Sequence, residues 1–296
     1  MLFGQNPPDI TYLGLNSGQK DPCVNTHLDL INIVLNSAKM NLELDIKNVC
    51  IDISELNLYP SFFECQIDQE ADEILKISDE VERIIINNRI RIVFYIGRGY
   101  FLGSQLPNIV EETSKLLNQL SLILDILQVD YPSIFVRIGS AYGNRKSTMN
   151  IFCDRVKKLN ENTVSKICVV NDDRPSLFSV TDLLTGVYYK IGIPISFRFL
   201  PHQFNDGGLS IREALFLSCS TWERNKKPLI FYSESKNCDS NGIPETPHPS
   251  EYLTRRIPTF GLDIDVVVDS PAREDVCLKY RMDYKSLPPV VINRVN

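Results

Sequence analysis

The sequence reads IRIVFYI at residues 90–96, PNIVEETSKLLNQLSLILDIL at residues 107–127 and IFVRI at residues 134–138. The first and last of these segments are short and almost wholly apolar, which is typical of parallel strands covered on both faces. The middle segment repeats apolar residues at the helical period, and Pro107 stands at its start, where the missing N–H costs little. The three segments therefore predict a strand, a helix and a second, parallel strand.

The same alternation continues toward both ends of the chain. Apolar runs predict eight strands, at residues 10–15, 49–54, 90–96, 134–138, 167–170, 193–199, 229–232 and 264–268. Helical periods begin near Thr26, cover residues 68–88, 107–127 and 147–159, and start again at Ser179 and Ser210, where Ser-x-x-Asp and Ser-x-x-Glu resemble capping boxes. Residues 237–249, rich in Asn, Gly, Pro and Ser, are expected to form a loop.

Eight strand–helix units in one chain predict the α/β class and a single (β/α)₈ TIM barrel at residues 10–283. An N-terminal arm at residues 1–9 and a C-terminal tail at residues 284–296 would flank it. The prolines and β-branched residues of the tail suit either an arm laid on a neighbour or a segment packed on its own barrel. A doubly wound sheet is the alternative fold, but no Gly-rich phosphate fingerprint follows the first strand.

The composition is that of an ordinary globular protein. The 296 residues include 31 basic and 37 acidic side chains, a net charge of −6, with 43% hydrophobic and 23% charged residues. This balance excludes a chain that coats nucleic acid by bulk positive charge, but it allows a local basic patch. The three histidines, His27, His202 and His248, are too few for a metal site built mainly from imidazoles. His27 falls in the first turn of a helix, where we expect a surface position.

Compartment signals are few. The sequence has neither a run of 18 apolar residues nor a signal-peptide pattern, so we expect no membrane association and no secretion. Eight cysteines are scattered without a C-x-x-C pair, and several lie in apolar runs, where a thiol packs as a small hydrophobic group. An intracellular, reducing compartment is the expectation.

Three stretches, in their order and spacing, resemble the UV-damage endonuclease family, relatives of the endonuclease IV type of apurinic-site nuclease. Residues 137–145 read RIGSAYGNR where the family has HVGGVYGDK, and residues 169–173 read VVNDD where it has LENDD. Residues 192–222 match a Gly-Ile-Pro turn followed by Leu-Ser-Leu-Arg-Glu-Ala-Leu. Weaker matches at residues 94–98 and 265–269 extend the resemblance over roughly residues 10–283.

The resemblance implies a TIM barrel that cuts damaged DNA beside the lesion with a cluster of divalent metals at the barrel mouth. Metals in such a site polarise the phosphodiester and generate hydroxide, so imidazole and carboxylate ligands are required at the strand ends. Five positions where the family has His, His, Glu, Asp and His carry other residues here: Tyr95, Arg137, Val170, Arg198 and Phe231.

Few ligands of the implied metal cluster remain. They are His248, Asp269 in place of a glutamate, and His202, which lies one residue outside the expected register. Two or three ligands cannot hold several metals, and a fixed guanidinium close to a divalent ion repels it strongly at low dielectric. We therefore expect no cofactor, and Mn²⁺ or Zn²⁺ only if the site has been remodelled around these three residues.

Arginines stand where the implied metals would sit. Arg98, Arg137 and Arg198 fall at or just beyond strand ends, where they could replace metal charge and bind phosphate or a DNA backbone. Further basic residues could extend this surface along the rim: Arg145, Lys146 and Arg174.

The alternative interpretation is that these arginines are neutralised by nearby acids: Asp52, Asp172, Asp173 or Asp269. The polar run Asn171, Asp172 and Asp173 is interpreted as a remnant of the former site. We expect it to order the turn after its strand through side-chain to backbone bonds rather than to act in catalysis.

Three functions stay open at this point. The first is a catalytically degenerate homologue of the UV-damage endonucleases, kept as a DNA- or phosphate-binding or structural component. The second is a working metal-dependent repair endonuclease that incises UV-damaged DNA. The third is a scaffold subunit of a larger protein assembly, without a role at nucleic acid. The sequence favours the first, and no residue is assigned a catalytic role.

Overall fold

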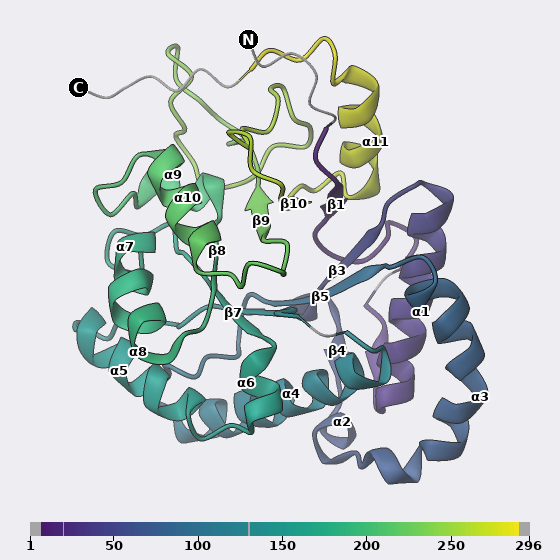
Figure 1. Ribbon diagram of the computed structural model, residues 1–296. Coiled ribbons are helices and arrows are strands. Elements are labelled where there is room, and N and C mark those ends of the chain that lie inside the picture. Colours follow the sequence, from purple (N-terminus) through teal and green to yellow (C-terminus); the bar gives the residue numbers. More distant parts are fainter. Residues whose placement is uncertain (1–6, 20, 130, 290–296) are drawn as a thin grey trace.

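A computed structural model describes residues 7–19, 21–129 and 131–289, and it places strands at the centre and helices around them (Figure 1). Within these residues the barrel contains eight parallel strands: β1 (Ile10–Tyr12), β3 (Asn48–Asp52), β5 (Arg91–Ile96), β6 (Ile134–Val136), β7 (Ile167–Val170), β8 (Ile195–Ser196), β9 (Leu229–Tyr232) and β10 (Asp265–Val268). Each matches a strand expected from the sequence.

The strands close into a barrel through two single bridges. One sheet has the order β3-β5-β6-β7-β8 and the other the order β1-β10-β9. A parallel bridge between Leu13 and Cys50 joins β1 to β3, and another between Arg198 and Phe231 joins β8 to β9. The prediction of a single-domain TIM barrel is confirmed.

Helices cover the outside of the barrel. They are α1 (His27–Glu43), α2 (Pro60–Glu64), α3 (Ala71–Val81), α4 (Pro107–Ile126), α5 (Arg145–Val156), α6 (Glu161–Ser165), α7 (Val180–Leu183), α8 (Tyr189–Ile191), α9 (Phe199–Phe204), α10 (Ile211–Ser220) and α11 (Glu274–Asp283). Turns of π-helix, η3 (Glu82–Ile86) and η4 (Leu184–Tyr188), continue α3 and α7, and short 3-10 turns lie at η1 (Ile53–Glu55) and η2 (Ile67–Gln69). A small parallel pair, β2 (Cys23–Val24) with β4 (Asn57–Leu58), lies outside the barrel.

The capping signals act as the sequence predicts. At the start of α7 the Ser179 hydroxyl accepts the Asp182 backbone N–H, and the Asp182 carboxylate accepts the Ser179 N–H. Ser210 and Glu213 form the same reciprocal pair at α10. The expected loop at residues 237–249 has neither helix nor strand assigned.

The segment after β8 differs from the sequence prediction. The expected strand at residues 193–199 ends at Ser196, and Phe199 begins α9. The side chain of Asn171, beyond the end of β7, bonds the backbone of Arg198: its Oδ1 accepts the Arg198 N–H at 2.7 Å and its Nδ2 donates to the carbonyl at 3.1 Å. A side chain thus replaces the next ladder bonds, and the chain is free to turn into a helix that carries His202.

Two hydrophobic clusters separate the barrel interior from its helical coat. The larger packs the outward faces of the strands against the helices. The smaller fills the barrel, and Tyr95, Val170 and Phe231 belong to it. The Tyr95 and Phe231 rings lie 5.2 Å apart. Three positions where metal ligands were implied are therefore part of a packed apolar interior.

The described part of the predicted tail packs on its own chain, because Arg256 donates to the carbonyls of Tyr284 and Lys285 at 3.0 and 2.9 Å. Residues 1–6 of the predicted arm and 290–296 of the tail lie outside the described residues. Among the described helices, none has both the length and the apolar character needed to cross a bilayer.

Candidate functional site

A pocket of about 970 Å³ opens at the carboxyl ends of the barrel strands, the end where function concentrates in this architecture. We call it the mouth pocket. Its lining includes four arginines, three aspartates and one histidine: Arg98, Arg137, Arg174, Arg198, Asp52, Asp173, Asp269 and His248. Most of the residues that the sequence nominated therefore come together around one cavity.

Arg137, which follows β6, is paired with Asp172, which follows β7. The Arg137 Nε donates to Asp172 Oδ1 at 2.6 Å, an Nη2 hydrogen reaches the same oxygen, and Asp173 Oδ1 lies 4.0 Å away. The Asp172 side chain is only 1% exposed. Although burial disfavours the charged guanidinium, Asp172 raises the pKa of Arg137 above its ordinary value. The charge of Arg137 is thus largely neutralised by acids of the protein itself.

Arg198 is neutralised in a looser way. Its Nη2 lies 3.6 Å from Asp269 Oδ2, and its guanidinium lies 5.6 Å from the centre of the Tyr95 ring. The backbone of Arg198 is fixed by Asn171, as described above. Asn171 thus orders the backbone after β8 and not, as the sequence predicted, the turn after its own strand, while Asp172 serves as an ion-pair partner.

Asp52 is also engaged. Its Oδ1 accepts the backbone N–H and the hydroxyl of Ser54 at 2.8 and 2.7 Å, which caps the turn after β3. Burial raises the pKa of Asp52 above its ordinary value, and the nearby Asp269 adds to this increase. Hydrogen bonds from Ser54 therefore hold the Asp52 carboxylate in place, and the neighbouring charge of Asp269 disfavours its ionised form.

Two arginines of the mouth pocket remain available to a ligand. Arg98 and Arg174 are exposed, and their guanidinium groups have neither a hydrogen bond nor an ion pair to any described residue. His248 is exposed beside them, and its backbone carbonyl accepts from the Lys236 N–H at 2.8 Å. The two arginines give the rim a positive character that the paired arginines do not supply.

Other nominated residues lie away from the mouth pocket. Arg145, at the start of α5, donates to Asp182 Oδ2 at 3.0 Å and to the Leu177 carbonyl at 3.2 Å. Lys146 is exposed on the same helix. His202 is buried in α9, where its Nε2 lies 3.1 Å from the Leu209 carbonyl oxygen, and burial lowers its pKa. His202 therefore does not join His248 and Asp269 at the pocket.

The mouth pocket does not fit the metal cluster that the sequence resemblance implies. Guanidinium groups occupy two of the strand ends, and their acid partners are committed to them. Across the part of the chain that the structure describes, one group of three His, Cys, Asp or Glu side chains has its donor atoms within 4.8 Å of one another. That group is His27, Cys65 and Glu70, and it does not line the mouth pocket.

The expectation for His27 was wrong. Its side chain is 0% exposed, because it lies between Glu70 and Gln119. Sequence reasoning missed this cluster because no metal-binding spacing joins the three positions. The predicted helix start at Thr26 placed His27 in a first helical turn. Its partners Cys65 and Glu70 lie 38 or more residues further along the chain.

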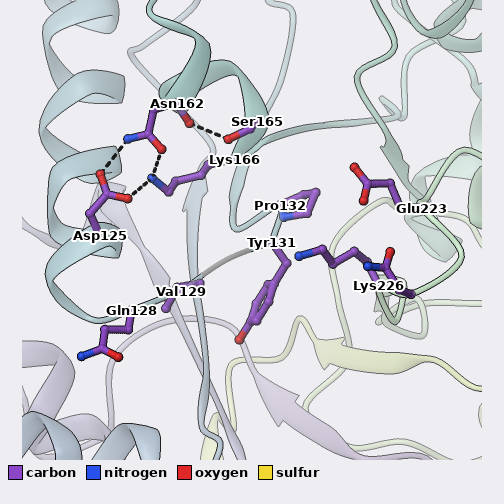
Figure 2. Close-up of a pocket in the computed structure, with 11 residues that line it drawn as sticks. Asp125, Gln128, Val129, Tyr131, Pro132, Asn162, Ser165, Lys166, Glu223 and Lys226 are labelled. Atoms are coloured by element: carbon purple, nitrogen blue, oxygen red, sulfur yellow. Dashed lines mark hydrogen bonds and ion pairs between the residues drawn. The ribbon is translucent and has the colours of Figure 1, made fainter.

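A second pocket, of about 580 Å³, lies at the amino ends of the strands (Figure 2). Figure 2 shows Lys166 pointing toward Asp125 and Asn162, and its Nζ donates to Asn162 Oδ1 at 2.7 Å. Lys166 is buried and satisfied by these bonds. Residues at this end of a TIM barrel usually serve stability rather than catalysis, so the mouth pocket is the candidate site.

Sequence comparison identifies relatives of this chain. A family model described as UV-endonuclease UvdE matches residues 63–293. A UV DNA damage endonuclease from Clostridium perfringens is 29% identical over 166 residues, which is 54% of this chain and 40% of that protein. A relative from Bacillus cereus is 24% identical over 160 residues and is covered over 50% of its length. The chain thus spans about half the length of the curated relatives it matches.

Structural comparison supports the barrel independently. The crystal structure of SacUVDE matches with a TM-score of 0.78 at 22% identity, over 95% of this chain and 99% of that one. Endonuclease IV from Thermus thermophilus matches with a TM-score of 0.59 at 12% identity, over 94% and 99%. At these identities the likeness shows the shared fold and nothing more.

Proposed function

The chain belongs to the UV-endonuclease UvdE family, and from that premise we propose that it serves DNA repair by binding DNA at its barrel mouth without cutting it. The proposal separates two properties of the mouth pocket. One is the loss of a place for catalytic metals, and the other is the presence of free cationic groups on the rim.

The main support for the proposed loss of cleavage is that the strand-end arginines are paired with acids. Hydrolysis by this type of site needs several divalent ions that bind the phosphodiester and activate water. The Arg137–Asp172 and Arg198–Asp269 pairs place fixed positive charge at two strand ends and engage the carboxylates of Asp172 and Asp269. A divalent ion placed there would have to displace a guanidinium from its acid partner.

The rim supports binding of a polyanion. Arg98 and Arg174 are free to donate bidentate hydrogen bonds to phosphate oxygens, which is the geometry that guanidinium groups favour. His248 can add a further donor from the 237–249 loop. Binding through two or three backbone phosphates would be weak, dependent on salt and largely independent of sequence.

Binding to a labelled UV-irradiated duplex, followed by fluorescence anisotropy at low and moderate salt, tests this proposal. We expect Arg98→Ala/Arg174→Ala to weaken binding about tenfold. The slope of log affinity against log salt concentration should also fall by roughly two, about one for each lost phosphate contact. Arg83→Ala is the matched control, since its side chain is 70% exposed on the outer helical layer. Equal affinity of the wild type and the double variant would refute a role of the rim. Absence of any DNA binding by the wild type would favour the scaffold hypothesis instead.

A further inference from the structure

We propose that His27, Cys65 and Glu70 form a Zn²⁺ site in the helical layer, separate from the mouth pocket and independent of the proposed function. The three residues come from different elements. His27 begins α1, Cys65 follows α2, and Glu70 directly precedes α3. Figure 1 shows α1 and α3 beside each other and α2 near α4, which carries the supporting residue Gln119.

The donor atoms of these residues already converge. His27 Nδ1 lies 2.6 Å from Glu70 Oε2, and Cys65 Sγ lies 3.1 Å from the same oxygen. All three donor atoms lie within 4.8 Å of one another. A thiolate, an imidazole and a carboxylate are the ligand types that Zn²⁺ binds, at about 2.0–2.3 Å each. Small movements of the side chains would place a metal among them.

Gln119 fixes the orientation of the His27 ring. Its Nε2 donates to the carbonyls of Phe63 and Cys65 at 3.4 and 3.1 Å, so its Oε1 faces His27 Nε2 at 2.5 Å. Because Gln119 Oε1 is an acceptor, His27 Nε2 must carry the hydrogen. In the neutral form of the ring, the lone pair is on Nδ1, toward Glu70. A metal-ligating histidine typically donates its other N–H to such a partner.

In the neutral form of the ring, two acceptors face each other: His27 Nδ1 and Glu70 Oε2. Glu70 Oε2 is the shared partner of His27 Nδ1 and Cys65 Sγ. A carboxylate oxygen and an unprotonated Nδ1 at 2.6 Å are two donor atoms that a shared cation can bind. Zn²⁺ would supply it, and with thiolate and carboxylate ligands its charge is cancelled, which favours burial. The Cys65 thiol proton would pass to solvent on binding.

The position of the site indicates a structural role. A metal held there would join the start of α1 to the segment between α2 and α3, and Gln119 would connect it to α4. Three protein ligands leave one coordination position for water. Because the three residues are distant in sequence, binding would favour the folded over the unfolded chain.

Titration of the metal-free protein with Co²⁺, followed by near-ultraviolet absorption, tests this site. We expect one equivalent of Co²⁺ to produce a thiolate-to-cobalt charge-transfer band that Zn²⁺ removes by displacement. Cys65→Ser should lose the band, whereas Cys238→Ser, which changes an exposed cysteine elsewhere, should retain it. Zn²⁺ should also raise the melting temperature of the wild type and of Cys238→Ser by several degrees, and that of Cys65→Ser much less.

The contrary result is equally clear. If the protein shows no band, or a band that Cys65→Ser preserves, the metal site is refuted. The same conclusion follows if ¹⁵N spectra show His27 with both ring nitrogens protonated and unchanged by Zn²⁺, since a proton then provides the cation. Far-ultraviolet circular dichroism of Cys65→Ser verifies that the variant folds before the titration is interpreted.

Discussion

Arg137 and Arg198 determine what the barrel mouth can hold. Each follows a short strand: the partner of Arg137 follows the neighbouring strand β7, and the partner of Arg198 follows β10, two strands away around the barrel. The Arg137–Asp172 pair is the tighter one, because two nitrogens of the guanidinium reach one buried carboxylate oxygen. Asp172 Oδ2 is buried without a hydrogen-bond partner among the described residues. Asp172 therefore depends on Arg137 for its stability in the fold.

Arg137→Met should destabilise the protein by about 3 kcal/mol, because it leaves the Asp172 charge buried and unpaired. The double variant Arg137→Met/Asp172→Asn should recover much of this loss, since the charge is then removed as well. Urea denaturation followed by circular dichroism measures both. Arg145→Met, at a half-exposed pair with Asp182, should cost less than about 1 kcal/mol. A double variant as unstable as the single one would show that the ion pair is not the cause.

His202 should make the stability of the protein depend on pH. Burial lowers its pKa in the folded state, so the unfolded chain binds the proton more readily. The free energy of unfolding should therefore fall as the pH decreases through about 6.5, the ordinary pKa of histidine. His202→Gln should reduce this loss between about pH 7.5 and pH 5.5. Urea denaturation at several pH values measures it, and an identical slope in the variant would contradict the assignment.

The candidate site was only partly predictable from the sequence. Strand-end positions placed Arg98, Arg137 and Arg198 around one pocket, and pairing with Asp172 and Asp269 was one of the two interpretations left open. Which acid pairs with which arginine depends on side-chain geometry, and the hydrophobic periodicity of the sequence contains no information about that geometry. His27 shows the same limit, since its burial depends on Glu70 and Gln119, which are 43 and 92 residues away.

The strands and the capped helices were the most predictable elements. Continuous apolar runs with their neighbouring turns located every barrel strand, because strands buried on both faces have a strong sequence signal. The short helix α9 was missed because its first residue, Phe199, continues the strand-like alternation of Ile193, Ile195 and Phe197. The bonds from Asn171 to Arg198 decide the outcome there.

The capping box of α7 offers a direct test at this level. Ser179 is buried, and its hydroxyl accepts the Asp182 N–H at 3.2 Å. Ser179→Ala should lower the free energy of unfolding by about 1–2 kcal/mol, because an N–H at the helix start loses its partner. Thr181→Ala, which removes a hydroxyl of the same helix that donates to the Gly207 carbonyl at 2.8 Å and does not cap the helix start, serves as the comparison. Thermal or urea denaturation measures the difference, and equal stability of the two variants would argue against the capping role.

The two ends of the barrel differ in what closes them. At the amino end, Arg91 Nη1 bonds Asp265 Oδ2 at 2.7 Å, and its guanidinium lies over the rings of Tyr131 and Trp222. At the carboxyl end, the apolar interior reaches Tyr95 and Phe231 and is followed by the paired arginines. The molecule thus retains the family's barrel, while five positions where the resemblance implies metal ligands carry other residues.

The incision assay tests most directly whether the mouth binds DNA without cutting it. The purified protein is incubated with a UV-irradiated duplex labelled on one strand, in the presence of Mn²⁺ or Zn²⁺, under conditions where the duplex is bound. We predict that strand cleavage stays at the level of the protein-free reaction. Metal-dependent incision beside the lesion, abolished by His248→Ala or Asp269→Ala, would contradict the account.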